Sequence, residues 1–354
     1  MQNNTANSGG NWKRNVLIAL CAFLALVFIL LAVGTVYVHS LLGQLNRVDP
    51  DDDHTLSASD AEDFTDPGME TIDPSDEETL PNIDEVIIGT EPFIPEKHDP
   101  RIINILLVGQ DRRPGEGRQR SDSMMMVTFN TKKNTITLTS LMRDSYVQIP
   151  GYKNNKLNAA YAFGGFKLLN KTLKINFGIF VDGNVEVDFN GFKEIIDYLG
   201  GVEIKLTQKE ADYLNENYGF KLSAGTQVLN GAQALGYSRI RKIDTDYRRT
   251  ERQRTVLISL LNRYKDKPVS EMLAILNHIL PKITTDMSNG EILGLAGQLL
   301  PMLSTAQVNT FQIPVNGTFK QGNAQVRPGF KAWFQYDIDF AANRKAVQKL
   351  LSVD

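Results

Sequence analysis

The most constraining feature of this sequence is a run of 23 residues, Val16 to Val38, that contains no charged side chain. A helix rises about 1.5 Å per residue, so this run is long enough to cross the roughly 30 Å hydrocarbon core of a bilayer. A cleaved secretion signal is the alternative, but its apolar region covers only about 7–15 residues. We therefore expect a retained transmembrane helix over residues 16–38.

The charges on either side of this run predict its orientation. Lys13 and Arg14 precede the run, whereas the chain becomes acidic after Arg47. Positively charged residues favour the cytoplasmic side, which predicts a cytoplasmic tail over residues 1–15. We expect a single-pass protein of the cell membrane whose remaining residues are extracytoplasmic.

The formal net charge of −3 averages segments of opposite character. Residues 49–99 contain 18 Asp and Glu against one basic residue, whereas residues 100–354 contain 34 Lys and Arg against 23 Asp and Glu. The acidic stretch has recurring prolines and few large apolar side chains, so it cannot bury enough surface to offset chain entropy. It predicts a disordered acidic spacer over residues 39–99, with an acidic binding motif as the alternative. Residues 100–354 are the expected folded body.

Cysteine and histidine are nearly absent from this body. The single cysteine, Cys21, lies in the apolar run, and only one of the four histidines, His278, falls within residues 100–354. Disulfides and cysteine-based zinc sites are therefore excluded there. A Ser-His-Asp triad or a site with several histidine ligands is not expected either.

Hydrophobic patterns in the body alternate between strands and helices. Apolar runs predict strands over residues 102–108, 123–129, 135–141 and 202–206. Helical spacing recurs over residues 189–199, 207–217, 230–236, 249–264, 270–280, 289–303 and 341–351. Such alternation predicts an α/β domain layered about a central sheet.

A charged, glycine-rich segment, residues 109–122, leaves the first predicted strand. It contains Asp111, Arg118, Arg120 and Asp122. Folds of the α/β class place their ligands at such strand ends, and arginine forks match phosphate oxygens while carboxylates suit a hard cation such as Mg²⁺. A solvated, salt-bridged surface loop explains the segment equally well when it is taken alone.

Two further charged segments follow. Arg143 and Asp144 leave the strand over residues 135–141, where a local surface ion pair is the alternative. In the segment 237–253, Arg239 and Arg241 face the same side if the backbone is extended. Further along this segment, a helix would put Arg249 and Gln253 on one face and allow Asp246 to cap its start. Arginines and carboxylates without histidine or cysteine suit phosphate chemistry, where catalysis rests on positioning and charge stabilisation.

Six motifs occur in order between about residues 102 and 260. They are GQD…RSDSMMMVTFN, SLMRDSYVQIPG, NKLNAAYAFGG, VDFNGFKEIIDYLGGVEI, LNGAQALGYSRIR and DYRRTERQRTVL. With these motifs the chain resembles the LytR-CpsA-Psr family, in which a single-pass anchor also precedes the body. The resemblance implies a three-layer α/β/α domain with a central mixed sheet and an apolar groove for a polyprenyl chain.

The resemblance also implies an extracytoplasmic transferase of Gram-positive-type envelopes. Such an enzyme moves a glycopolymer, a teichoic acid or a capsular-type polysaccharide, from undecaprenyl pyrophosphate to the muramic acid C6 hydroxyl of peptidoglycan, forming a phosphodiester. Mg²⁺, or Mn²⁺ in its place, would be the cofactor. The implied partners are the lipid-linked glycopolymer, peptidoglycan and the membrane.

Site residues follow from the resemblance only where the motifs match. Asp111 and Asp122 would hold the metal directly or through water. The pyrophosphate would be bound by Arg120, Arg143, Arg239, Arg241 and Arg249, with Gln253 in support, and Arg118 and Asp144 complete the substrate-binding set. Asp246 would orient or deprotonate the acceptor hydroxyl.

Two residues depart from the family pattern. Met142 replaces the usual proline before Arg143, and Arg248 replaces the usual small residue before Arg249. Neither departure removes a charged motif residue, so we expect activity to survive.

Two other functions compete with transfer. The first is a non-catalytic, membrane-anchored binder of lipid-linked intermediates that regulates the envelope or attenuates transcription. The second is nucleic-acid binding, which the positive charge of the body would favour. No aromatic-basic recognition motif occurs, and the expected topology puts the body outside the cell, so we expect no nucleic-acid partner.

Overall fold

The computed structural model describes residues 34, 36–49, 55–63, 69–72, 80–86, 88, 99–111, 118–241 and 243–353. The chain divides into two compact units, Met1–Leu45 and Asn46–Asp354. In the first unit, residues 36–42 are helical. The expected transmembrane helix and cytoplasmic tail fall almost entirely outside the described residues. Within the described ranges, no helix has the length and apolarity needed to span a bilayer.

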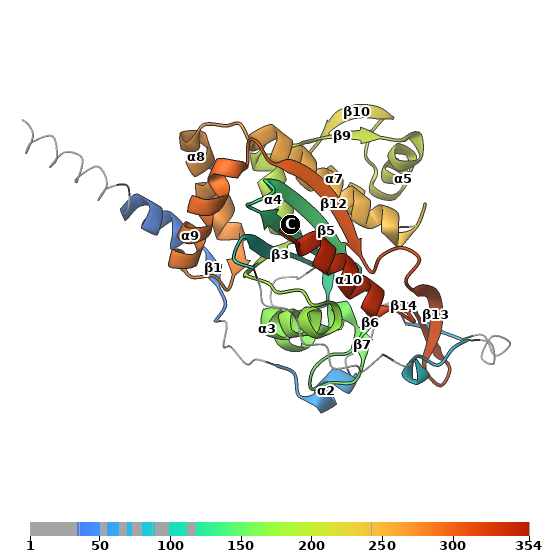
Figure 1. Cartoon of the computed structure of the whole chain (residues 1–354). Helices are drawn as coiled ribbons and strands as arrows, with labels where there is room; N and C mark the ends of the chain where they lie inside the picture. The colour runs from blue at the N-terminus through green and yellow to red at the C-terminus, as the bar shows by residue number, and fades with distance from the viewer. Residues whose placement is uncertain are drawn as a thin grey trace, which may run out of the picture. The chain divides into compact units, whose positions relative to one another are not determined.

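The second unit is built on a seven-stranded mixed sheet with the order β1-β11-β8-β3-β4-β5-β12 (Figure 1). These strands are β1 (Asn46–Arg47), β3 (Ile102–Gln110), β4 (Ser121–Asn130), β5 (Thr135–Leu141), β8 (Gly183–Asp188), β11 (Thr284–Thr285) and β12 (Gln307–Ile313). The pairs β1–β11, β3–β8 and β5–β12 are parallel, and the other three pairs are antiparallel. The mixed central sheet confirms the α/β class.

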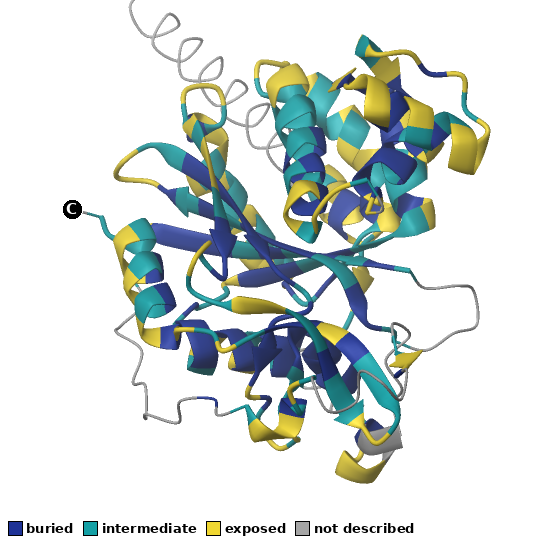
Figure 2. Ribbon diagram, turned by 90° about the vertical axis from the view of Figure 1, so that its right-hand side faces the viewer, coloured by how far each residue is buried: buried dark blue, intermediate teal, exposed yellow. Residues whose placement is uncertain are grey.

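The methionine run in β4 shows that both faces of this sheet are covered. Neighbouring side chains of a strand point to opposite faces. Met124 and Met126 join the hydrophobic core beside α3 (Leu157–Phe177), whereas Met125 joins a cluster with Leu257 and Leu261 of α7 (Asp246–Tyr264). All three methionines are buried, as Figure 2 shows for the strands at the centre of the molecule. Helices on both faces give the layered arrangement.

The helices divide between the two faces. Besides α3, the first face carries α10 (Phe340–Leu351), whose Phe340 ring packs on Phe177. On the second face lie α4 (Phe189–Tyr198), α5 (Gln208–Tyr218), α6 (Gly231–Ser238) and α7, with the antiparallel pair β9 (Val202–Leu206) and β10 (Gly225–Leu229). The helices α8 (Val269–Ile279) and α9 (Asn289–Leu299) flank β11 in the chain. Each expected helix of the body is present within a few residues of its predicted bounds.

No hydrophobic period predicted the helix α3, although its first nine residues lie in one of the six motifs. Sixteen of its 21 residues are buried, so no polar face gives the sequence a helical period. The backbone departs from helical geometry at Gly164 and Gly165, where φ is −150° and +59°. A side chain at Gly165 would also meet the Arg118 guanidinium, whose Cζ lies 2.9 Å from the Cβ position. Glycine at this position therefore allows the kink and the close approach of Arg118.

The expectation of a disordered spacer over residues 39–99 is wrong for several of its segments. The strand β1 belongs to the central sheet, and β2 (Glu70–Thr71) pairs with β14 (Phe330–Tyr336), which also pairs with β13 (Lys320–Arg327). Short elements α2 (Ala58–Asp63) and η1 (Ile83–Glu85) lie along the same stretch. The average composition is acidic, but a few apolar side chains at intervals are enough to pack each segment on the body. In the acidic part, residues 49–99, the buried apolar side chains are Ala61, Ile72, Ile83 and Ile88.

Candidate active site

A cavity of about 380 Å³ opens on the second face of the sheet. The sheet and three helices, α4, α6 and α7, supply most of its wall. Most of the lining side chains are apolar, among them Leu107, Val185, Val187, Phe189, Phe192, Ile195, Leu235, Val256, Leu257 and Leu260. The polar side chains of the lining are Asp122, Ser123, Arg143, Ser238, Arg239, Arg241, Arg249 and Gln253.

The character of the cavity wall changes along α7. Arg249 and Gln253, in the first turns of the helix, contribute polar groups, whereas Val256, Leu257 and Leu260 contribute apolar ones further on. A cavity of this kind can hold a ligand with an anionic head and a long apolar tail. The amphipathic pattern of α7 therefore positions both halves of the site.

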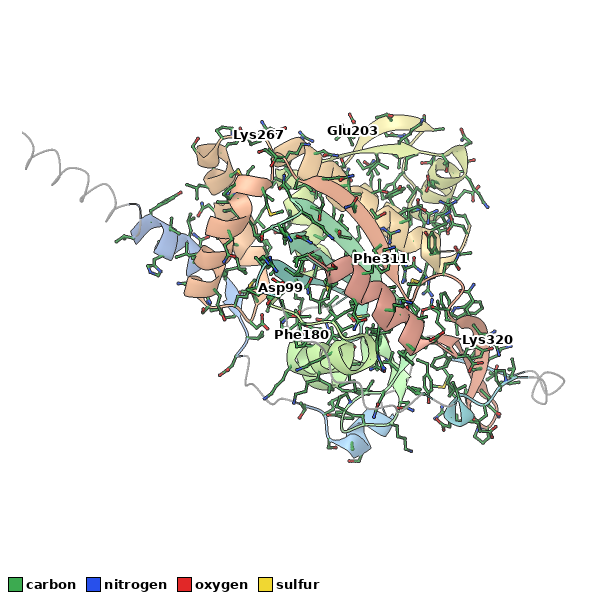
Figure 3. All side chains as sticks on the ribbon, in the orientation of Figure 1. Asp99, Phe180, Glu203, Lys267, Phe311 and Lys320 are labelled. Atoms are coloured by element: carbon green, nitrogen blue, oxygen red, sulfur yellow. The ribbon has the colours of Figure 1, made fainter. Side chains whose placement is uncertain are left out.

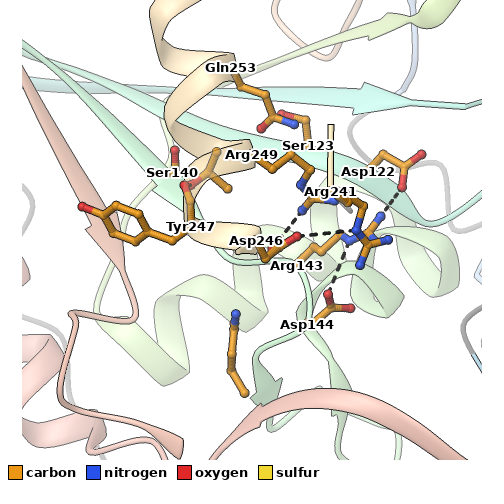
Figure 4. A network of polar contacts seen from close by, with 12 residues as sticks. Asp122, Ser123, Ser140, Arg143, Asp144, Arg241, Asp246, Tyr247, Arg249 and Gln253 are labelled. Carbon is orange, nitrogen blue, oxygen red and sulfur yellow. Dashed lines mark hydrogen bonds and ion pairs between the residues drawn. The ribbon is translucent and has the colours of Figure 1, made fainter. Parts of the chain in front are cut away.

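Three arginines and three aspartates form a network at the polar part of the cavity (Figure 4). The guanidinium of Arg143 pairs with Asp122 and lies 3.5 Å, Nε to Oδ2, from Asp144. Asp246 pairs with the other two arginines. Its Oδ2 lies 3.0 Å from Nη2 of Arg249, and its Oδ1 lies 3.8 Å from Nε of Arg241.

Arg249 is the most buried cation of this network, with 5% of its side chain exposed. Burial and the neighbouring positive charge of Arg143 lower its pKa to about 10, against the opposing effect of Asp246. Within the described part of the chain, its Nε donates no hydrogen bond. A buried guanidinium beside other cations is costly unless an anion joins it, so this position favours a phosphate ligand.

Two other arginines of the same motif have structural partners. Arg252 pairs with Asp244 and, at 2.7 Å from Nε to Oε1, with Glu210. Arg254 donates a hydrogen bond of 2.6 Å to Oγ of Ser140. These contacts tie α7 to α5, to the preceding loop and to β5. The dense charge of this motif therefore serves both the fold and the cavity.

The remaining cavity side chains lie on different elements. Arg239 lies 4.7 Å from the ring centre of Phe189 and 3.7 Å, Nη2 to Oδ2, from Asp111. Oε1 of Gln253 accepts a hydrogen bond of 2.9 Å from Oγ of Ser123. These contacts connect β4 with α7, and the ends of β3 and α6 with the start of α4, around the polar part of the cavity.

The start of α7 differs from the expected cap. Thr245, rather than Asp246, is the N-cap residue, and Asp246 is the first helical residue. The carboxylate of Asp246 is directed at Arg249 and Arg241 (Figure 4). Asp246 thus faces the arginines of the cavity instead of capping the helix.

Arg118 and Arg120 lie apart from the cavity lining. Nη1 of Arg120, a buried side chain, lies 3.2 Å from Oδ1 of Asn158 in α3. The guanidinium of Arg118 lies 5.9 Å from the ring centre of Tyr161, also in α3. Four of the five arginines expected around one pyrophosphate therefore line the cavity.

Sequence reasoning missed several residues of this region. Lys156 is buried, and its Nζ lies 3.4 Å from Oδ1 of Asp144. In the sequence, the only indication of a functional role for Lys156 was its position in one of the six motifs, ahead of an apolar stretch. Ser123 lines the cavity together with Met125, as the alternation of β4 would have predicted. Two further lining residues, Val185 and Val187, belong to β8, which was not predicted.

Comparison with known protein families identifies the family of this chain. The model of the LytR_cpsA_psr family matches residues 74–332, which is most of the chain. The chain belongs to the LytR-CpsA-Psr family. The matched range begins within the acidic stretch and includes η1, whose Ile83 packs in the core of the body.

Relatives of this LytR-CpsA-Psr protein differ in their names. It is 31% identical over 264 residues to regulatory protein MsrR of Staphylococcus aureus, covering 73% of this chain and 77% of that one. It is 37% identical over 164 residues to the polyisoprenyl-teichoic acid–peptidoglycan teichoic acid transferase TagU of Bacillus anthracis, covering 46% of this chain and 52% of that one.

A solved structure of the family is similar in fold. The LytR-CPS2A-psr family protein YwtF (TagT) with bound octaprenyl pyrophosphate lipid has a TM-score of 0.54 and 26% identity. The match covers 76% of this chain and 96% of that one. The likeness extends over nearly the whole of that solved chain.

The two departures from the family pattern have plain structural settings. Met142 is buried, and its N–H donates a hydrogen bond of 2.8 Å to the carbonyl of Ile313, a bond that proline could not make. Arg248 is exposed and donates to Glu251 at 2.6 Å. Neither residue lines the cavity of this LytR-CpsA-Psr protein.

Proposed function

We propose that this protein transfers a glycopolymer from a polyprenyl pyrophosphate carrier to the muramic acid C6 hydroxyl of peptidoglycan, forming a phosphodiester. The observation that carries the proposal is the cavity, in which a cluster of arginines continues into an apolar wall. The arginines suit a pyrophosphate, and the wall suits the prenyl chain attached to it. The bound lipid of TagT and the name of TagU support the same substrate class.

The arginines supply charge stabilisation. Arg143 comes from one part of the chain and Arg241 and Arg249 from another, and the three meet at one place, so they can contact several phosphate oxygens at once. Charge on those oxygens changes during phosphoryl transfer, and fixed cations in a partly desolvated cavity stabilise it. Arg239 extends the cationic surface towards Asp111.

The transfer step exchanges one phosphorus–oxygen bond for another. The acceptor hydroxyl oxygen bonds to the phosphorus that carries the glycopolymer, while the bond from this phosphorus to the bridging oxygen breaks. The carrier leaves as its monophosphate. We assign the hydroxyl proton to Asp246, because no described group donates a hydrogen bond to its buried Oδ1.

The residues present fit a magnesium ion shared with the substrate. Asp122 lies on β4 and Asp111 directly follows β3, which pairs with β4 through Gln110 and Ser121. Among the described residues no group of three or more metal-binding side chains occurs. Mg²⁺ commonly takes one or two carboxylates and completes its shell with phosphate oxygens and water. Asp111 and Asp122 would hold the ion, which would neutralise pyrophosphate charge.

The proposal is tested with the full chain reconstituted in vesicles. The vesicles receive a labelled lipid-pyrophosphate-linked glycopolymer, Mg²⁺ and a peptidoglycan glycan acceptor. We expect labelled glycan and carrier monophosphate to appear in equal amounts. Donor binding without either product would show that the protein is a binder of lipid-linked intermediates. A regulatory role of such a binder would agree with the name of MsrR, a regulatory protein.

A further inference from the structure

The helices α8 and α9 are apolar but, among their described side chains, contain no buried residue. Their sequences, VSEMLAILNHI and NGEILGLAGQL, carry one acidic side chain each, Glu271 and Glu291, and no Lys or Arg. None of residues 270–279 or 289–299 is buried, and Leu276, Leu293 and Leu300 are 39–47% exposed. By contrast, α3 buries most of its residues. Apolar surface gathered on adjacent helices indicates an interaction site.

The chain enters the central sheet beside these helices. The strand β1 pairs in parallel with β11, which lies between α8 and α9 in the sequence, and Figure 1 shows β1 beside α9. Only seven residues, 39–45, separate the expected transmembrane run from β1. Seven residues span at most about 25 Å. If the run crosses the bilayer, β1 is tethered close to its outer surface.

The acidic stretch does not lengthen this tether. It follows β1 in the chain and precedes β3, and its described segments pack on the body. The helices α8 and α9 are therefore near the membrane by connectivity. Lys265 and Lys267 precede α8, and Lys282 follows it (Lys267 is labelled in Figure 3). Lys267 pairs with Glu271 at 2.9 Å and Lys282 pairs with Glu194, both at exposed positions where anionic lipid headgroups can compete for the lysines.

One wall of the cavity adjoins α8. The ring of Tyr198, the last residue of α4, stacks on His278 of α8 with centroids 3.9 Å apart. The same helix α4 lines the cavity with Phe189, Phe192 and Ile195. A bilayer in contact with α8 would thus lie near the apolar wall that suits a prenyl chain.

We propose that α8, α9 and the turn η3 (Leu300–Met302) after α9 dock on the outer surface of the lipid bilayer, with Leu276, Leu293 and Leu300 at the boundary between headgroups and acyl chains. This inference rests on the membrane anchoring in the proposed function. Short tethering, exposed apolar residues and flanking lysines together favour a bilayer over a second protein. Docking would let the prenyl tail of the substrate pass from the bilayer to the cavity with little exposure to water.

Tryptophan fluorescence in brominated vesicles tests the docking directly. The full chain carries Trp12→Phe and Trp333→Phe as background, and Leu293→Trp provides the probe. Val228→Trp, at an exposed position of β10, is the matched control. We expect bromine-labelled lipid to remove most of the Leu293→Trp emission and to leave the Val228→Trp emission unchanged. Unquenched emission at position 293 would overturn the proposal, and a blue-shifted but unquenched spectrum would indicate a second protein copy.

A kinetic test separates docking from catalysis. Leu276→Glu combined with Leu293→Glu should lower transfer from a long-chain donor in vesicles by about tenfold, because charge opposes insertion of the apolar face. Transfer from a water-soluble short-chain donor should stay at the wild-type rate, as should both reactions in Val228→Glu. Equal loss with both donors would refute the docking role. Absence of transfer by the wild type would refute the proposed function instead, while the quenching result would still stand.

Discussion

Arg249 and Arg252 are both buried on α7, three residues apart, but their surroundings differ in charge. Arg252 contacts two carboxylates, Asp244 and Glu210, and hydrogen bonds to them raise its pKa against the effect of burial. Among the described residues, Arg249 pairs with one carboxylate, that of Asp246, which it shares with Arg241. Its pKa is lowered to about 10 by burial and by the neighbouring Arg143.

The difference separates two uses of a buried cation. A guanidinium matched by carboxylates joins elements of the fold, because its charge is neutralised within the protein. A guanidinium short of negative charge keeps part of its interaction capacity for a ligand. We therefore assign Arg252 to stability and Arg249 to anion binding. Four predictions test this division.

The largest effect is expected for Arg252→Met. Removing one partner of a buried ion pair leaves the carboxylates of Glu210 and Asp244 without their guanidinium, which costs about 3–5 kcal/mol. The free energy of unfolding, measured by denaturant titration, should fall by this amount. A variant as stable as the wild type would show that the ion pairs of Arg252 with Glu210 and Asp244 do not stabilise the fold.

Arg249→Met should affect catalysis instead. Loss of one charge-stabilising donor should lower the transfer rate on the order of 10²–10³-fold. The thermal unfolding midpoint should stay close to that of the wild type, because the substitution also removes repulsion from Arg143. Arg249→Lys, which keeps the charge without the fork, should retain part of the rate. A large drop in the thermal unfolding midpoint of Arg249→Met would show that Arg249, like Arg252, stabilises the fold.

Tyr237 lies beside Arg252, and the ionisation of its phenol should make the free energy of unfolding depend on pH. Burial and the Glu210 carboxylate raise its pKa to about 12. Between pH 10 and 12 the unfolded phenol ionises while the folded one keeps its proton, so stability falls by about 1.4 kcal/mol per pH unit. Tyr237→Phe should remove this part of the slope in unfolding free energy against pH. An unchanged slope would contradict the raised pKa.

The smallest effect is expected for Arg248→Ala. Arg248 forms an exposed pair with Glu251, and such pairs contribute about 0–1 kcal/mol. Stability and transfer should both stay near wild-type values, which makes this variant a control for charge removal on α7. A strong loss of transfer would mean that Arg248 approaches the substrate.

Much of the fold followed from local patterns. The strand over residues 202–206 has its predicted bounds, and the expected strands at 102–108, 123–129 and 135–141 match or lie within the observed ones. These segments have strong apolar runs with clear turns beside them. The helix α3 was missed because burial on nearly all sides removes the helical period. The strand β8 was missed because its sequence contains only two apolar side chains, Val185 and Val187, among polar residues and glycine.

The sequence predicted the types of residue in the site better than it predicted their arrangement in space. Six of the predicted side chains line the cavity, whereas Arg118 and Arg120 contact α3. The six are Asp122, Arg143, Arg239, Arg241, Arg249 and Gln253. Sequence spacing places arginines near strand ends but does not give the side to which a loop turns. Lys156 was missed because a lone lysine before an apolar stretch resembles an ordinary surface residue.

The sequence by itself determined the uncharged run, the separation of acidic and basic segments, the scarcity of histidine and cysteine in the body, and the family. Only the tertiary structure decided which charges are matched. It placed Arg252 between two carboxylates and Arg249 among arginines, and it brought the acidic stretch back onto the body after β1. The physical reason is that composition and period are local, whereas the energy of a buried charge depends on neighbours that the fold brings from distant positions.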